Sequence, residues 1–150
     1  MTKLSRRAML STLVAAAVAP RAFAQPPQKM DVFKSPTCGC CEKWVSHVRA
    51  SGFAPTATDV DDMTVVKTQR HVPTALQSCH TAIVAGYVIE GHVPAEDIKR
   101  LLKERPAIAG LAVPGMPSGS PGMEGAAPRP YDVVAFDKQG KTRVFATHGR

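Results

Sequence analysis

Three of the four cysteines of this 150-residue chain fall within four consecutive residues, Cys38-Gly39-Cys40-Cys41. Cys38 and Cys41 form a C-x-x-C pair that directly follows Ser35-Pro36-Thr37, where a helix is expected to begin. The unpaired N–H groups and the positive dipole end of a helix N-terminus stabilise a thiolate and lower its pKa below the free value of about 8.5. Cys38 and Cys41 are therefore predicted to be redox-active thiols that can form a disulfide.

The remaining sulfurs exceed what a redox pair needs. Cys40 adds a third thiol within one helical turn, and Cys79-His80 supplies a fourth sulfur and an imidazole from a distant part of the chain. Clustered thiolates favour soft metals, namely Cu(I), zinc and iron–sulfur clusters. The sequence thus predicts a metal site formed by Cys38, Cys40, Cys41, Cys79 and His80.

Two methionines narrow the choice of metal. Met116 and Met123 lie in a Gly- and Pro-rich segment rather than in an apolar periodic one, as expected of a soft-metal arm. Thioethers are realistic protein ligands for copper but hardly for zinc, so one or more copper ions, as Cu(I), are predicted. His92 joins the two methionines as a secondary ligand candidate. His47 lies about 10 Å along the helix from Cys40 and is expected to be too distant.

Each of these residues also has an ordinary structural interpretation. Four cysteines in an exported protein can form two structural disulfides in three pairings, although the adjacent Cys40 and Cys41 make tidy pairing awkward. His80 and His92 are alternatively hydrogen-bonding histidines, and the two methionines incidental loop residues. Trp44 is expected to belong to the core.

The N-terminus reads as an export signal over residues 1–24. It has a head with Arg6-Arg7, an Ala-rich apolar stretch and a small-x-small cleavage site at Ala22-Phe23-Ala24. The arginine pair is similar to the bacterial twin-arginine signal, with a plain secretory signal as the alternative. The apolar stretch is shorter than the roughly 20 residues of a membrane anchor, so no anchor is expected after cleavage. Residues 25–150 are then expected to be the mature protein, which works outside the cytoplasm.

Charge argues against a nucleic-acid partner. The formal charge of +7 comes from 19 Lys and Arg against 12 Asp and Glu. Four of the basic residues lie in the predicted signal, which leaves 15 against 12, or +3, for the mature chain. That excess is small and is not gathered into basic runs. With 44% hydrophobic and 21% charged residues, the composition is that of a globular domain.

Periodicity predicts a single α/β domain. Strands are expected at 30–34, 53–60, 81–84 and 87–90, with helices from about Cys38 to Gly52, over 63–69, and between Pro94 and Pro106. Gly110–Pro130, with five Gly and five Pro, is expected to be a long loop, followed by a hairpin of 131–136 and 143–147. This order is typical of a thioredoxin-like (glutaredoxin-like) α/β unit.

Four motifs in order resemble the CopG-like proteins, domain-of-unknown-function family 411, over about residues 30–148. They are the segments Phe33–Trp44 with Cys-Gly-Cys-Cys, Ser78–Ala82 with Cys-His, Gly86–Pro94, and Ala112–Glu124 with the two methionines. The resemblance implies a thioredoxin-like fold in the bacterial periplasm, copper binding at Cys38, Cys40, Cys41 and Cys79, and a part in copper resistance. The glycine that the family usually has before Val72-Pro73 is replaced here by His71.

Two functions follow from this sequence and are kept apart. The first is an exported copper-binding protein of copper resistance or homeostasis, with other periplasmic copper-handling or redox proteins as its expected partners. The second is a thiol–disulfide oxidoreductase that uses Cys38 and Cys41. Copper binding alone is not expected to make the protein an enzyme; if it is one, the expected activity is that of an oxidoreductase that couples copper and thiol redox states.

Overall fold

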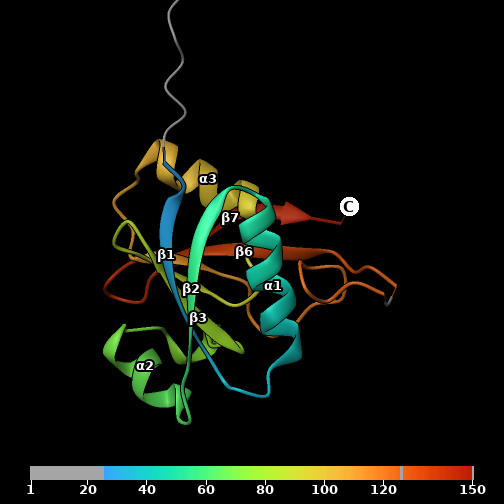
Figure 1. The fold of residues 1–150 in the computed structure, drawn as a ribbon. Helices are drawn as coiled ribbons and strands as arrows, with labels where there is room; N and C mark the ends of the chain where they lie inside the picture. The colour runs from blue at the N-terminus through green and yellow to red at the C-terminus, as the bar shows by residue number, and fades with distance from the viewer. Residues whose placement is uncertain (1–25, 126, 150) are drawn as a thin grey trace, which may run out of the picture.

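The computed structural model describes residues 26–125 and 127–149, and the export signal predicted over 1–24 lies outside the described residues. The described chain forms a seven-stranded mixed sheet with α-helices packed on it (Figure 1). The strands are β1 (Gln28–Lys34), β2 (Phe53–Asp59), β3 (His80–Val84), β4 (Tyr87–Glu90), β5 (Gly110–Ala112), β6 (Tyr131–Phe136) and β7 (Thr142–His148). The helices are α1 (Gly39–Ala50), α2 (Met63–Gln69) and α3 (Ala95–Glu104), with a short 3-10 turn at Thr74–Leu76.

The strand order brings several chain segments to one end of the sheet. The order is β2-β1-β3-β4-β5-β6-β7, with parallel pairing of β1 with β2 and of β4 with β5, and antiparallel pairing elsewhere. Because β3 runs against both β1 and β4, the carboxyl ends of β1, β4 and β5 meet the beginning of β3 at the same edge. The predicted site residues follow or precede these four strand ends.

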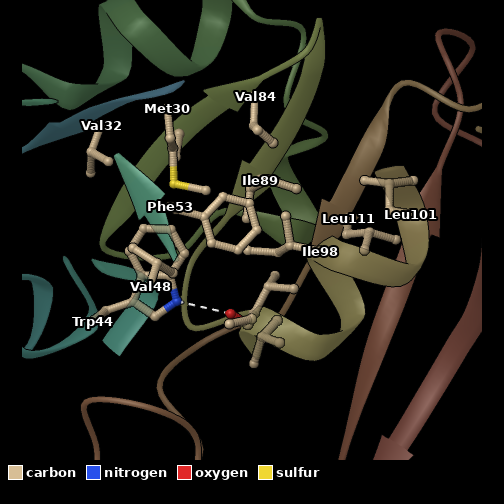
Figure 2. Close-up of a cluster of buried hydrophobic side chains, with 14 of the residues drawn as sticks. Met30, Val32, Trp44, Val48, Phe53, Val84, Ile89, Ile98, Leu101 and Leu111 are labelled. Carbon is tan, nitrogen blue, oxygen red and sulfur yellow. Dashed lines mark hydrogen bonds between the residues drawn. The ribbon is translucent and has the colours of Figure 1, made fainter. Parts of the chain in front are cut away.

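The two faces of the sheet carry different cores. The larger cluster joins Met30, Ile89 and Leu111 of the strands to Trp44 and Val48 of α1 and to Ile98 and Leu101 of α3, so these two helices share one face (Figure 2). Trp44 is fully buried, as predicted, and its Nε1 donates to the Val93 carbonyl at 2.9 Å, the dashed line of Figure 2. Because side chains alternate along a strand, Val88 lies with Phe136 in a smaller cluster on the opposite face.

The predicted α/β domain is confirmed, with one correction. Most elements lie within two residues of their predicted bounds, and the hairpin at the C-terminal end is present as β6 and β7. The segment from Gly110 was predicted to be loop, but its first three residues form β5, a central strand between β4 and β6. A Cβ on Gly110 would lie 2.0 Å from the Val88 carbonyl oxygen, so the glycine is needed for this close pairing of strands rather than for a turn.

The turn at His71 is formed in the left-handed backbone region. His71 has φ +54, and its exposed side chain makes no hydrogen bond in the described chain, while its N–H donates to the Thr68 carbonyl. Glycine adopts this region without the penalty that a Cβ incurs, which agrees with the glycine expected here from the family resemblance.

We expect His71→Gly to stabilise the protein by about 0.5–1 kcal/mol, because relief of backbone strain outweighs the added entropy of the unfolded chain. Chemical denaturation of metal-free protein measures the change. Gln69→Gly, at the exposed end of α2, is the matched control and should instead lose about 1 kcal/mol. Equal losses in both variants would contradict this account of the turn.

No helix in the described residues is long and apolar enough to cross a membrane.

Candidate metal centre

All four cysteines meet at the sheet edge where β1, β3, β4 and β5 come together. Cys38 occupies the N-cap position of α1, and Cys40 and Cys41 lie in its first turn. Cys79 directly precedes β3, the neighbour of β1. The four sulfurs lie within 4.8 Å of one another, so the predicted grouping of the cysteines is present in the structure.

Two of the cysteines are joined and two are free. Cys38 and Cys41 form a disulfide with their Cα atoms 5.3 Å apart, as one turn at the start of a helix allows. The Cys40 sulfur lies 3.5 Å from that of Cys38 and 3.9 Å from that of Cys79. The free pair therefore lies directly beside the disulfide. Two structural disulfides, the alternative reading of the sequence, are not what this structure contains.

The histidines line the buried side of Cys79. His92 Nε2 lies 3.0 Å from the Cys79 sulfur, and its Nδ1 lies 2.7 Å from the Pro121 carbonyl oxygen. A carbonyl only accepts, so Nδ1 carries the proton and the Nε2 lone pair faces Cys79. His80 Nδ1 lies 3.4 Å from the same sulfur. These three residues form a second group of metal-ligand atoms within 4.8 Å of one another.

His80 carries a polar atom with no protein partner. The side chain is fully buried against Trp44, with ring centroids 4.3 Å apart. Its Nε2 is the one buried side-chain nitrogen or oxygen without a hydrogen bond among the described residues. A buried unpaired nitrogen costs about 1–3 kcal/mol, so an additional partner for this nitrogen would be stabilising. The His80 atom that faces the Cys79 sulfur is Nδ1, so the unpaired Nε2 does not by itself mark a metal ligand.

Burial shifts the pKa values of Cys79, His80 and His92 toward their neutral forms in the metal-free protein. Burial and the neighbouring Cys40 raise the pKa of the Cys79 thiol to about 12. Burial lowers the pKa of His92, and it lowers that of His80 well below its usual value, with the neighbouring imidazole and Lys67 acting in the same direction. A protonated Cys79 donating to the His92 lone pair satisfies both groups. Metal binding to this thiol must release its proton.

We expect Cys79 of oxidised, metal-free protein to react with iodoacetamide at least about a hundredfold more slowly at pH 8 than in the urea-unfolded chain, because only the thiolate is the nucleophile. The raised pKa also predicts that the rate keeps rising about tenfold per pH unit beyond pH 9. Peptide mass spectrometry after timed quenching measures both. A rate that levels off near pH 8.5 would contradict the raised pKa.

The chain after β5 closes over the cysteines and brings in one of the two methionines. Met116, about half exposed, places its sulfur 3.9 Å from that of Cys40. The Ser78 hydroxyl donates to the Gly115 carbonyl and so ties this segment to the residue before Cys79. The sulfur of Met123 makes no such contact with a cysteine in the described chain, where its backbone bonds to Gly119 and Ser120. The structure therefore separates the two methionines that the sequence treats alike.

A glycine holds the same segment against α1. Gly122 has φ +91, and a Cβ there would lie 2.7 Å from the Cys40 carbonyl oxygen and 3.2 Å from His92 Nδ1. Sequence reasoning missed Gly122 and the neighbouring Pro121 carbonyl. The only sequence feature that pointed to these two residues was the high Gly and Pro content of the loop. His47, expected to be too distant, lies away from the sulfurs and accepts a hydrogen bond from the Ala95 N–H at 3.1 Å.

The arrangement combines a soft donor set with a redox pair. It offers thiol sulfurs, a thioether and two imidazoles, a set that suits Cu(I) better than hard cations. The disulfide is two electrons more oxidised than a dithiol, so the same four cysteines can hold metal in the reduced state and store oxidising equivalents in the state seen here.

Comparison with known proteins identifies similar chains. A family model described as "Protein of unknown function, DUF411" matches residues 76–123, which include Cys79, His80, His92 and Met116. Two solved structures of copper resistance protein copG, form 1 and form 2, are each 44% identical to this chain with a TM-score of 0.78. Form 1 covers 83% of this chain and 99% of its own, and form 2 covers 82% and 99%. No curated protein matches the chain.

Proposed function

Because this chain belongs to the DUF411 family and is a homologue of copper resistance protein copG, we propose that it binds copper as Cu(I) in copper resistance. The ligands are Cys38, Cys40, Cys41 and Cys79, with His80 beside them. The carrying observation is that four sulfurs from two distant segments lie within 4.8 Å of one another. Cu(I) gains its affinity from such soft donors held in one place.

The accessory ligands are assigned from their contacts. Met116 reaches the Cys40 sulfur from the solvent side, so it is proposed as the outer thioether ligand. His92 touches Cys79 through a lone pair and is proposed as a secondary ligand on the buried side. For Met123, the only support for a ligand role is its place in the Gly- and Pro-rich segment of the sequence.

A redox role is the second candidate, and the disulfide beside the free thiols favours it. In the coupled form, two Cu(II) ions each take one electron from the reduced Cys38 and Cys41. The two thiols then lose two protons to solvent and form the disulfide, and two Cu(I) ions result. Without copper, the same pair would serve as a periplasmic thiol–disulfide oxidoreductase acting on protein partners.

An anaerobic Cu(I) titration of the fully reduced protein, with reactive thiols counted at each addition, tests the copper function. Binding through the cysteine cluster predicts that all four thiols become protected together as the first ions bind. Oxidised protein is the matched control and should bind more weakly, because its disulfide removes two thiolates. Thiols that stay freely reactive throughout the titration would contradict the proposal.

The fold and the location complete the proposal. We infer a thioredoxin-like core from the parallel β1-α1-β2 unit, the C-x-x-C at the start of α1, and the antiparallel β3 and β4 followed by α3. The 1–24 segment supports export to the periplasm through the twin-arginine route. There, copper and an oxidising environment would both reach the cysteines.

We expect the exported protein to begin at Gln25, because Ala22-Phe23-Ala24 is a small-x-small cleavage site. Intact mass of the periplasmic fraction measures this. Replacing Arg6 and Arg7 together by Lys should block export on the twin-arginine route, whereas Lys3→Arg, the control, should not. Normal export of the double Lys variant would indicate a plain secretory signal instead.

A further inference from the structure

A buried polar network lies under the Cys79 segment, on the sheet face opposite α1. Its centre is the Glu90 carboxylate, which has no exposed surface. Lys67 of α2, 5% exposed, donates to Glu90 Oε1 at 2.5 Å, and the Thr81 hydroxyl donates to Glu90 Oε2 at 2.6 Å. Lys67 also donates to the Thr81 hydroxyl at 3.1 Å. Every charged group in this network is thus paired.

Stability alone does not explain such a pair. Removing two charges from water costs several kcal/mol per ion, and replacement of a buried ion pair by well-packed apolar side chains is often neutral or stabilising. Lys67 is nevertheless the one fully buried residue of α2, so a charged side chain rather than an apolar one is the most deeply buried part of this short helix. The network must therefore supply something that packing would not.

The network holds the backbone on both sides of Cys79-His80. Glu90 Oε1 accepts the N–H of Ser78 at 2.6 Å, one residue before Cys79, and Glu90 Oε2 accepts from Thr81, one residue after His80. Glu90 itself lies in β4, paired with Thr81 in register. One carboxylate therefore fixes the segment that carries the fourth sulfur.

The same segment leads on to the thioether. The Ser78 hydroxyl bonds to the Gly115 carbonyl, next to Met116. Gly91 closes the other side, where a Cβ would lie 2.6 Å from the Ser78 side chain and 2.7 Å from the Val113 carbonyl oxygen. Little space is left for Ser78 to move away from the position in which its N–H meets the Glu90 carboxylate.

We propose that Glu90 and Lys67 are positioning residues that hold Cys79 against Cys40 before any metal binds. The benefit of this positioning rests on the proposed copper function. The position of Cys79 beside Cys40 does not, because it is already present in the metal-free protein. Two carboxylate oxygens serve three donors here, which no neutral side chain of similar size can do. Lys67 in turn orients the carboxylate so that one oxygen faces Ser78 and the other faces Thr81.

The distance between Cys40 and Cys79 can be tested without copper. In oxidised, metal-free protein these are the two free thiols, since Cys38 and Cys41 form the disulfide. Dibromobimane, a short reagent with two thiol-reactive arms, bridges two thiols only when they lie close together. The reaction is run at alkaline pH, and mass spectrometry distinguishes one bridging group from two separate adducts.

We expect Glu90→Leu to lower the bridged fraction on the order of tenfold, because the Ser78 N–H and the Thr81 hydroxyl lose their shared acceptor and Cys79 is no longer held beside Cys40. The double variant Lys67→Met with Glu90→Leu replaces the pair by apolar side chains, so it should stay folded and still bridge poorly. Glu90→Gln keeps one acceptor for the Ser78 N–H, so its bridged fraction should lie between that of the wild type and that of the leucine variants. It decides the matter if both leucine variants fail to fold.

Asp97→Asn is the matched control, because Asp97 is a buried carboxylate that pairs with His148 at 2.6 Å, away from the cysteines. Its bridged fraction should equal that of the wild type. Wild-type bridging in the folded Glu90 variants would overturn the proposal, and so would an equal loss in Asp97→Asn, which would indicate general loosening of the fold.

Cu(I) affinity of the same reduced variants separates this proposal from the copper function. A loss of bridging with a matching loss of Cu(I) affinity supports both. A loss of bridging with unchanged Cu(I) affinity keeps the positioning role and shows that Cys79 is not needed for copper. Unchanged bridging overturns the positioning role whatever the copper result.

Discussion

Changing any one of Cys38, Cys40, Cys41 or Cys79 to Ser is expected to lower Cu(I) affinity by about a hundredfold or more. Groups behind a metal ligand typically contribute ten- to a hundredfold, so loss of a ligand itself should reach at least the upper end of that range. The four sulfurs lie within 4.8 Å of one another, so removal of one leaves the others under-coordinated. Competition with a Cu(I) chelator under anaerobic conditions measures the change.

The same four variants distinguish the copper protein from an oxidoreductase. Disulfide exchange needs only the bonded pair Cys38 and Cys41, so Cys40→Ser and Cys79→Ser should retain most of it. Copper binding should fall in all four. Normal copper binding by Cys79→Ser, with exchange lost only in the Cys38 and Cys41 variants, would contradict the copper function and leave the oxidoreductase.

The two methionines offer an internal control for this series. Met116→Leu should lower Cu(I) affinity less than a cysteine change does, because a neutral thioether on the exposed side is the weaker ligand. Met123→Leu should have a smaller effect still, since its sulfur makes no contact with a cysteine in the described chain. Cu(I) should also outcompete Zn²⁺, for which a thioether is a poor ligand.

The strong sequence signals were local ones. The aspartates before Met63 and the turn at Gly86 located α2 and β4 at their observed bounds, and Pro94 precedes α3 as predicted. The cysteine cluster was predictable because three of its members are adjacent in sequence and the fourth is followed by a histidine. Those signals need no knowledge of which strands are neighbours.

The features that the sequence did not predict depend on which strands and helices become neighbours in the fold. A three-residue strand at Gly110 has no periodicity to read, and it exists because β4 and β6 lie on either side of it. The pairing of Lys67 with Glu90 has no signal in the sequence, because the two residues lie 23 positions apart in different elements. Only the packing of α2 against β1 and β3 brings the two together as a buried pair beside Cys79.

The second large effect is expected at Gly122, which packs between α1 and His92. Gly122→Ala combines a strained φ of +91 with a Cβ that would lie 2.7 Å from the Cys40 carbonyl oxygen and 3.1 Å from the Trp44 backbone nitrogen. Strain of about 1–2 kcal/mol and overpacking of about 1–3 kcal/mol add to roughly 3 kcal/mol. The protein either loses this amount from its free energy of unfolding or relieves it by moving the Gly122 segment away from α1.

Gly125→Ala separates these two causes, because Gly125 has φ +103 but no atom within 4 Å of the added Cβ. It should lose only the strain of about 1–2 kcal/mol and leave Cu(I) affinity unchanged. In Gly122→Ala, displacement would remove the Pro121 carbonyl from His92, so Cu(I) affinity should fall on the order of tenfold. Denaturation and Cu(I) competition on the two variants measure both effects. If Gly122→Ala behaves like Gly125→Ala in both assays, the segment does not hold the copper site in place.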